Sequence, residues 1–127
     1  MSRQRRRYAS GDGIRVFRLP DARVRDGQVA RWLQSRPEPL RAIAVEWFGR
    51  LQSCGGDVRE IFHDGAAVAC VGDAAFAYVA VHLRHVNLGF YQGAVLEDPR
   101  RLLMGDGKLM RHVKLAPGVE ADRAALE

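Results

Sequence analysis

The residues with the clearest chemical potential form the segment LMGDGKLMRHVKL, residues 103–115. Gly105 and Gly107 flank an aspartate and precede Lys108, and consecutive backbone N–H groups beside a lysine can bind an anion where glycine lets the backbone approach. A Walker A loop needs Ser or Thr after the lysine and then a helix, whereas apolar and basic residues alternate here. Two interpretations stay open: a turn that leads into a strand, or an anion or ligand site that uses Lys108 and Arg111.

The histidines could form a site only if the fold gathers them. His82 and His85 are three residues apart, so a continuous strand would point them to opposite faces unless a turn between them brings them together. Their spacing is not that of a zinc site, and a structural role is the simpler interpretation for each. The four histidines are His63, His82, His85 and His112.

No arrangement typical of an enzyme is evident. Asp98 lies before Pro99 and most simply begins a turn, and Ser35 and Ser53 fall at expected helix ends, where capping explains them. No pair of carboxylates stands out for acid–base catalysis. The sequence therefore favours a protein that is not an enzyme and assigns no catalytic residue.

The composition is that of a globular protein with one domain. The 127 residues are 47% hydrophobic and 28% charged, which is typical of soluble domains of this length. No apolar run approaches the roughly 20 residues of a membrane helix, and the basic start lacks the apolar region of a signal peptide. Cys54 and Cys70 form neither a CxxC motif nor a disulfide framework. We therefore expect a cytoplasmic protein without a membrane partner.

The net charge of +5 is concentrated at the start of the chain, where arginines occupy positions 3, 5, 6 and 7. Without them the chain carries 16 basic and 15 acidic residues. The body therefore shows no basic stripe that would indicate nucleic-acid binding. Residues 1–20 are interpreted as a flexible basic lead-in, which is either a solvated arm or a segment that contacts polyanions.

Two amphipathic helices are expected at the start of the domain. Val29, Trp32 and Leu33 lie at i, i+3 and i+4 and place an apolar stripe on a helix over residues 26–35. The prolines of RPEP separate it from a second helix. That helix ends near Cys54-Gly55-Gly56, and its apolar stripe consists of Leu40, Ile43, Ala44, Trp47, Phe48 and Leu51.

The rest of the chain is typical of short antiparallel strands joined by close turns. Alternation makes one face of the later strands apolar and the other more polar, and we expect the helices to cover the apolar face. The polar face would carry Asn87 and Tyr91 beside Phe76, Tyr78 and His82. This patch would suit a partner or a small ligand, or else a second copy of the chain or the long connection after it would cover it. The expected strands are residues 58–62, 66–71, 75–83, 86–91 and 109–115.

Together these elements predict an α+β fold, a two-layer sandwich of about five antiparallel strands with the N-terminal helices packed on one face. Residues 119–127, VEADRAALE, are similar to the first turns of a short closing helix. No internal repeat is present, so residues 21–127 are interpreted as a single domain.

Three segments in the second half of the domain resemble the bacterial YdhG-like family, which is catalogued as a domain of unknown function. They are HVNLGFYQG, which begins at His85, the turn LEDP around Asp98 with two leucines after it, and GDGK with Arg111 following. With WL and PEPLR earlier in the chain, the resemblance covers Gln28 to Leu115. It implies a compact α+β domain similar to frataxins, and some members of the family are connected with iron handling and iron–sulfur assembly.

The acidic residues differ from those of a frataxin. Iron binding of that type relies on clustered carboxylate oxygens, whereas the N-terminal helices here carry Asp26, Glu38 and Glu46 among a larger number of arginines. Iron as a cofactor therefore rests on the resemblance alone. The acidic residues that do lie close together in the sequence are Asp57, Glu60 and Asp64.

The leading hypothesis is a non-enzymatic cytoplasmic binding or carrier domain of the YdhG-like family, with an iron-chaperone role as one form of it. The alternatives are a small-molecule or anion sensor, or a minor enzyme, that uses the GDGK segment, and polyanion contact through the arginine arm. The partner is expected to be a protein or a small molecule, and the protein could form a homodimer. The candidate ligand-binding residues are His85, Asn87, Tyr91, Asp98, Gly105, Gly107, Lys108 and Arg111.

Overall fold

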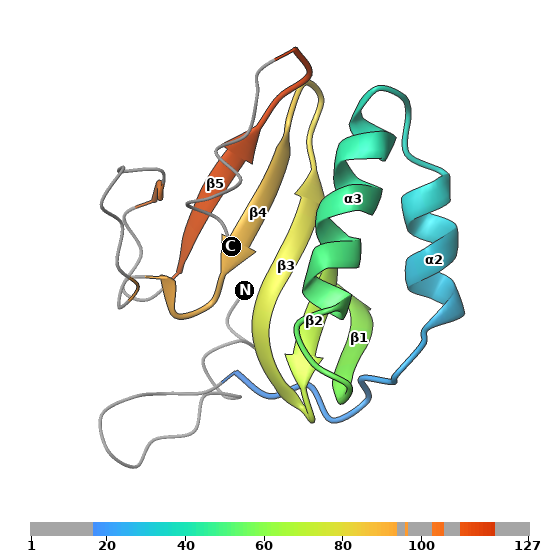
Figure 1. Ribbon diagram of the computed structural model, residues 1–127, viewed down its shortest axis with the longest axis vertical. Helices are drawn as coiled ribbons and strands as arrows, with labels where there is room; N and C mark the ends of the chain where they lie inside the picture. The colour runs from blue at the N-terminus through green and yellow to red at the C-terminus, as the bar shows by residue number, and fades with distance from the viewer. Residues whose placement is uncertain (1–16, 94–95, 97–102, 106–109, 119–127) are drawn as a thin grey trace.

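The computed structural model describes residues 17–93, 96, 103–105 and 110–118, and within these ranges two helices precede a sheet (Figure 1). The first helix, α2, spans Gly27–Gln34, and the second, α3, spans Leu40–Gln52. Asp26 caps α2, because its side chain accepts a hydrogen bond of 2.8 Å from the backbone N–H of Gln28, which would otherwise have no partner at a helix start. Both helices lie where the apolar spacing predicted them.

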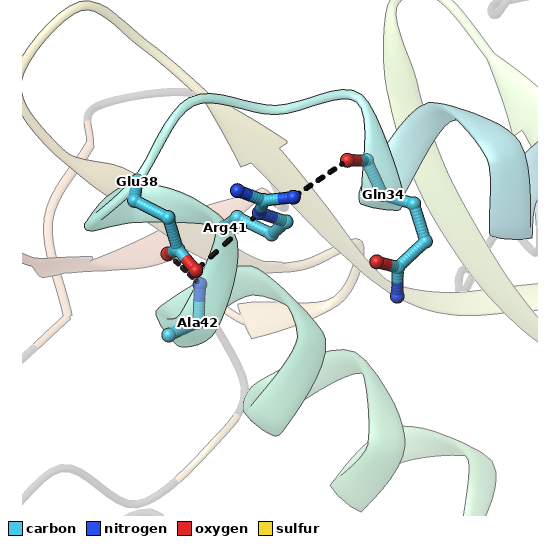
Figure 2. Close-up of polar contacts among 4 residues, drawn as sticks. All are labelled: Gln34, Glu38, Arg41 and Ala42. Atoms are coloured by element: carbon cyan, nitrogen blue, oxygen red, sulfur yellow. Dashed lines mark hydrogen bonds and ion pairs between the residues drawn. The ribbon is translucent and has the colours of Figure 1, made fainter.

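The RPEP connection fixes the end of α2 to the first turn of α3 (Figure 2). Arg41 donates a hydrogen bond of 3.2 Å through Nη1 to the backbone oxygen of Gln34. Glu38 accepts the backbone N–H of Ala42 at 3.1 Å, and its other oxygen lies 3.4 Å from Nε of Arg41. Because Arg41 is paired with Glu38 at the start of α3 and also bonds the last residue of α2, the predicted hinge is a fixed corner.

The strands form one antiparallel sheet in which each strand pairs with the next along the chain, in the order β1-β2-β3-β4-β5. The predicted α+β class and the five-stranded antiparallel sheet are thereby confirmed. The predicted closing helix, residues 119–127, lies outside the described residues. The strands are β1 (Val58–His63), β2 (Ala66–Val71), β3 (Ala74–Val81), β4 (Val86–Phe90) and β5 (Arg111–Leu115).

The main core lies between the helices and one face of the sheet. In Figure 1, α3 lies alongside β3, and α2 packs next to α3 on the side away from β4 and β5. The apolar stripes of both helices pack against strand side chains that point to one face of the sheet, as expected when helices cover the apolar face of an antiparallel sheet. The main core includes Val29, Leu33, Trp47, Phe48, Val79, Val86, Leu88 and Val113.

A second, smaller core lies on the opposite face of the sheet. Phe17 and Leu19 are 1% and 2% exposed, and backbone hydrogen bonds hold their segment to the start of β3, from Leu19 N–H to Asp73 O at 2.6 Å and from Ala75 N–H to Phe17 O at 2.7 Å. The expectation of a flexible lead-in is therefore wrong for residues 17–20, because alternating apolar residues there cover the sheet. Residues 1–16 lie outside the described residues. The second core consists of Phe17, Leu19, Ala22, Val68, Cys70, Ala75 and Tyr91.

A bulge in β3 changes which face its side chains occupy. Ala69 pairs with Ala77 while Cys70 pairs with Ala75, so Phe76 is an extra residue and the alternation is interrupted there. Phe76 packs against the main core and Tyr78 against the second core. The prediction that these two aromatic residues share a face is therefore wrong.

Within the described ranges, no helix has both the length and the apolar character that crossing a bilayer requires.

Candidate anion-binding face

The charges of the protein are segregated by strand. Residues 74–91 and 110–118, which contain β3, β4, β5 and the β3–β4 turn, include no Asp or Glu. The sequence totals conceal this segregation, because the acidic residues that balance the charge fall elsewhere along the chain. One half of the sheet is therefore purely basic, and its basic or protonatable residues are His82, Arg84, His85, Arg111, His112 and Lys114.

The strand register places several of these side chains on the sheet face opposite the helices. Asn87 pairs with Lys114, and Gly89 pairs with His112. Since side chains alternate along a strand and the intervening Val113 belongs to the main core, His112 and Lys114 point away from the helices. We call the surface at this end of the sheet the histidine face, and it comprises His82, His85, Asn87, His112 and Lys114.

The β3–β4 turn brings two of the histidines together. His82 donates its backbone N–H to the backbone oxygen of His85 at 2.8 Å, and their rings stack with centroids 4.8 Å apart and an interplanar angle of 22°. Nδ2 of Asn87 lies 3.2 Å from Nε2 of His82. A turn between His82 and His85 thus brings the two side chains together, as the sequence required for them to act as one site.

Tyr78 and Gly89 form the floor of the histidine face next to His112. A Cβ atom on Gly89 would lie 2.0 Å from both Cε2 and Cζ of Tyr78, so the ring lies directly on the Gly89 backbone, as aromatic residues do in cross-strand pairs with glycine. Burial raises the pKa of the Tyr78 hydroxyl, which therefore keeps its proton and can donate a hydrogen bond.

The histidines influence one another electrostatically. Desolvation lowers the pKa of His85 below the ordinary value of 6.5, and the neighbouring His82, Lys114 and His112 lower it further, while hydrogen bonding to Asn87 opposes them. Desolvation and His82 lower the pKa of His112 in the same direction. Both imidazoles are therefore neutral at pH 7, and a bound negative charge would favour their protonated forms.

Two of the predicted site residues belong to the histidine face, and a third lies beside it. His85 and Asn87 are members of the face. Gly105 has a φ of 115°, which glycine adopts readily, and a Cβ atom there would lie 3.7 Å from Nδ1 of His112. Its neighbour Met104 exchanges two backbone hydrogen bonds with His112, at 2.7 and 2.9 Å. The start of the GDGK segment therefore reaches the histidine face.

Two other predicted site residues lie elsewhere. Tyr91 is 3% exposed and belongs to the second core, where its ring packs 5.1 Å from Phe17, so it is not part of an open polar surface. Arg111 pairs with Phe90, and its side chain lies on the same face of β5 as that of Val113, the face toward the helices. Its Nη1 donates to the backbone oxygen of Met110 at 2.6 Å. The remaining predicted residues, Asp98, Gly107 and Lys108, lie outside the described residues.

Sequence reasoning missed His112 and Lys114 as site residues and treated His82 as structural. The available signal was the absence of Asp and Glu from residues 74–91 and 110–118, which becomes informative only when β3, β4 and β5 are neighbours in the sheet. The net charge of the whole chain could not reveal that the basic residues gather on these three strands.

The described residues contain no group of three or more His, Cys, Asp or Glu side chains arranged to hold a metal ion. Glu60, one of the clustered acidic residues, is 3% exposed. It accepts hydrogen bonds from the Asp26 backbone N–H at 2.9 Å and from Nε2 of Gln52 at 2.6 Å. This carboxylate therefore joins α2, α3 and β1 rather than facing solvent.

Comparisons with family models, with curated proteins and with solved structures gave no match. What the protein does is therefore inferred from the histidine face itself.

Proposed function

We propose that this chain is a non-enzymatic binding domain that takes small anionic ligands on the histidine face, and that it belongs to the YdhG-like family that residues 85–115 resemble. The observation that carries the proposal is the purely basic half-sheet, in which three imidazoles and Lys114 gather at one end without an acidic residue in their strands. Such a surface attracts anions and repels cations.

The histidine face presents hydrogen-bond donors to a ligand. Lys114 is exposed on this face, and the neighbouring imidazoles supply N–H donors. These are the groups with which proteins recognise carboxylate and phosphate oxygens.

Binding without catalysis agrees with the two serines and the buried cysteine of the described residues. Ser35 and Ser53 donate their hydroxyls to the backbone oxygens of Trp32 and Gly49, at 2.8 and 2.9 Å. Burial, with Asp73 nearby, raises the pKa of Cys70 to about 12, so its thiol stays protonated. None of these groups is activated for attack.

The iron-chaperone form of the family hypothesis is the weaker proposal. Ferrous and ferric ions prefer sites that include carboxylate oxygens, and the half-sheet described above has none. Anaerobic calorimetry with ferrous ion tests the iron-chaperone hypothesis. Stoichiometric heat of binding would support it and would indicate an iron site other than the histidine face.

The test of anion binding is a thermal melting screen with carboxylates, phosphate esters and sulfate, each compared with chloride at the same ionic strength. A ligand at 100 times its Kd should add about 2.7 kcal/mol of apparent stability. Lys114→Gln should reduce the shift, and Arg59→Gln is the matched control because Arg59 is an exposed base on β1. An equal loss in both variants, or no shift with any anion, would contradict the proposal.

A further inference from the structure

We propose that the histidine face binds multiply charged oxyanions together with protons, so that anion binding and protonation of the imidazoles occur as one coupled event. This inference rests on the proposed function, since it assigns the ligand class and the regulation of that same face. A ligand of this class carries two or more negative charges on several oxygens, as sulfate and phosphate esters do.

Protonatable groups are crowded together on the histidine face. His85 stacks on His82 at 4.8 Å within the turn, and β5 contributes His112 and Lys114. From β4 comes the uncharged amide of Asn87, and from β3 the Tyr78 hydroxyl. Because like charges at such separations repel, adding protons to these rings is unfavourable until an anion is present.

The amide of Asn87 lies among the imidazoles and can act toward them either as a donor or as an acceptor. Nδ2 lies 3.2 Å from Nε2 of His82. Rotation of the amide would instead present Oδ1 to a neighbouring ring nitrogen that carries a proton. Protonation of an imidazole next to Asn87 therefore need not leave its new N–H without a partner.

The shape and charge of an oxyanion suit the donors of the histidine face. An oxyanion offers several acceptors in three dimensions, which matches imidazole N–H groups from the turn and β5 and the ammonium group of Lys114. Two negative charges match one protonated ring together with Lys114, whereas a single negative charge matches only one of these positive charges. By linkage, a ligand that raises the pKa of a group takes up protons when it binds, and its affinity increases as the pH falls.

Sulfate is the probe, because its own charge is constant between pH 5 and 8. Calorimetric titration of the full chain at constant ionic strength should show tighter binding at pH 5.5 than at pH 7.5, by up to about tenfold per pH unit for each proton taken up. Titration at pH 6.5 in two buffers of different ionisation enthalpy counts the protons, and we expect uptake of about one proton per sulfate.

Two variants distinguish the groups that bind the anion from the groups that take up the protons. His85→Gln with His112→Gln should retain weak sulfate binding through Lys114 and lose most of the pH dependence. Lys114→Gln should weaken binding at every pH and keep the pH dependence. Amide NMR spectra of both variants check that the fold is unchanged.

The outcomes distinguish this inference from the proposed function. Sulfate binding that is independent of pH and takes up no protons would overturn the coupling and leave the anion-binding face intact. No sulfate binding at any pH would overturn both. Unchanged pH dependence in the double histidine variant would show that other groups take up the protons and would also overturn the inference.

Discussion

At the scale of single residues, Gly89 is required by the position of the Tyr78 ring. We expect Gly89→Ala to destabilise the protein by about 1 to 3 kcal/mol, as overpacking does, because its Cβ atom would lie 2.0 Å from the ring and would push it from its place against Tyr91, 5.4 Å away. The measurement is the midpoint of urea unfolding. Gly56→Ala is the control, since a Cβ atom there meets nothing within 4 Å. Equal midpoints for the two variants would contradict the close contact.

Glu60 is a second residue whose role is structural. Glu60→Ala should lower the free energy of unfolding by about 2 kcal/mol or more, because hydrogen bonds to the carboxylate are lost and their donors stay partly buried. The donors are the Asp26 backbone N–H and the Gln52 amide. Arg59→Ala, an exposed neighbour on the same strand, should change stability by less than about 0.5 kcal/mol. A Glu60→Ala variant as stable as this control would show that the carboxylate does not join the helices to β1.

The two cysteines should differ in reactivity by orders of magnitude. Cys54 is exposed, whereas Cys70 is buried and its pKa is raised to about 12, so only about one Cys70 in ten thousand is a thiolate at pH 8. A thiol reagent such as iodoacetamide should therefore modify one cysteine per native chain and two in denaturant. Cys54→Ser should abolish the native reaction, and rapid labelling of this variant would contradict the burial of Cys70.

At the scale of elements, the sequence predicted what depends on local periodicity. Spacing of three and four residues identified both helices, and alternation with turns identified the five strands. The face assignment failed at Phe76, since a one-residue bulge depends on how β3 meets β2 and leaves no mark in the local pattern. Tyr91 lies on the face that the alternation assigned to it, but it is buried there, because the segment that covers it, Phe17–Leu19, is far away in the sequence.

That covering segment is part of the core and should contribute to stability. Phe17→Ala should cost about 3 kcal/mol or more, as for other buried aromatic residues, because the Phe17 ring packs 5.4 Å from His63 and 5.1 Å from Tyr91. Urea unfolding monitored by circular dichroism measures the cost. Val24→Ala is the control, because Val24 follows the segment and is 53% exposed. Similar losses in the two variants would mean that residues 17–19 do not stabilise the sheet.

At the scale of the whole molecule, strand order converts an almost neutral body into a protein with one basic half-sheet. The sequence selected His85 and Asn87 as candidate residues because they belong to a recognisable segment. It could not place His82, His112 and Lys114 with them, since their proximity depends on the pairing of β3, β4 and β5. The site is thus a property of tertiary structure, and its charge pattern is visible only after the sheet is assembled.

The pH dependence of global stability should report the histidine face. The pKa values of His85 and His112 are lowered in the folded protein from the ordinary 6.5, so between those lowered values and 6.5 the unfolded chain binds more protons. Stability therefore increases with pH through this window. Above pH 6.5 the two imidazoles are neutral in both states and cost no stability. As the pH falls toward the folded pKa values, the unfolded chain takes up the protons more readily and the free energy of unfolding decreases.

We therefore expect a smaller free energy of unfolding at pH 5.5 than at pH 7.5 in chloride buffer, measured by urea denaturation. His85→Gln with His112→Gln should reduce the difference, while Arg59→Ala, which keeps every histidine, should not. Sulfate should restore stability most at the lower pH, because a ligand that binds only the folded state stabilises it more as its affinity increases. If the double variant loses as much stability as the wild type on acidification, the loss comes from carboxylates elsewhere, and desolvation and neighbouring charges do not lower the pKa values of His85 and His112.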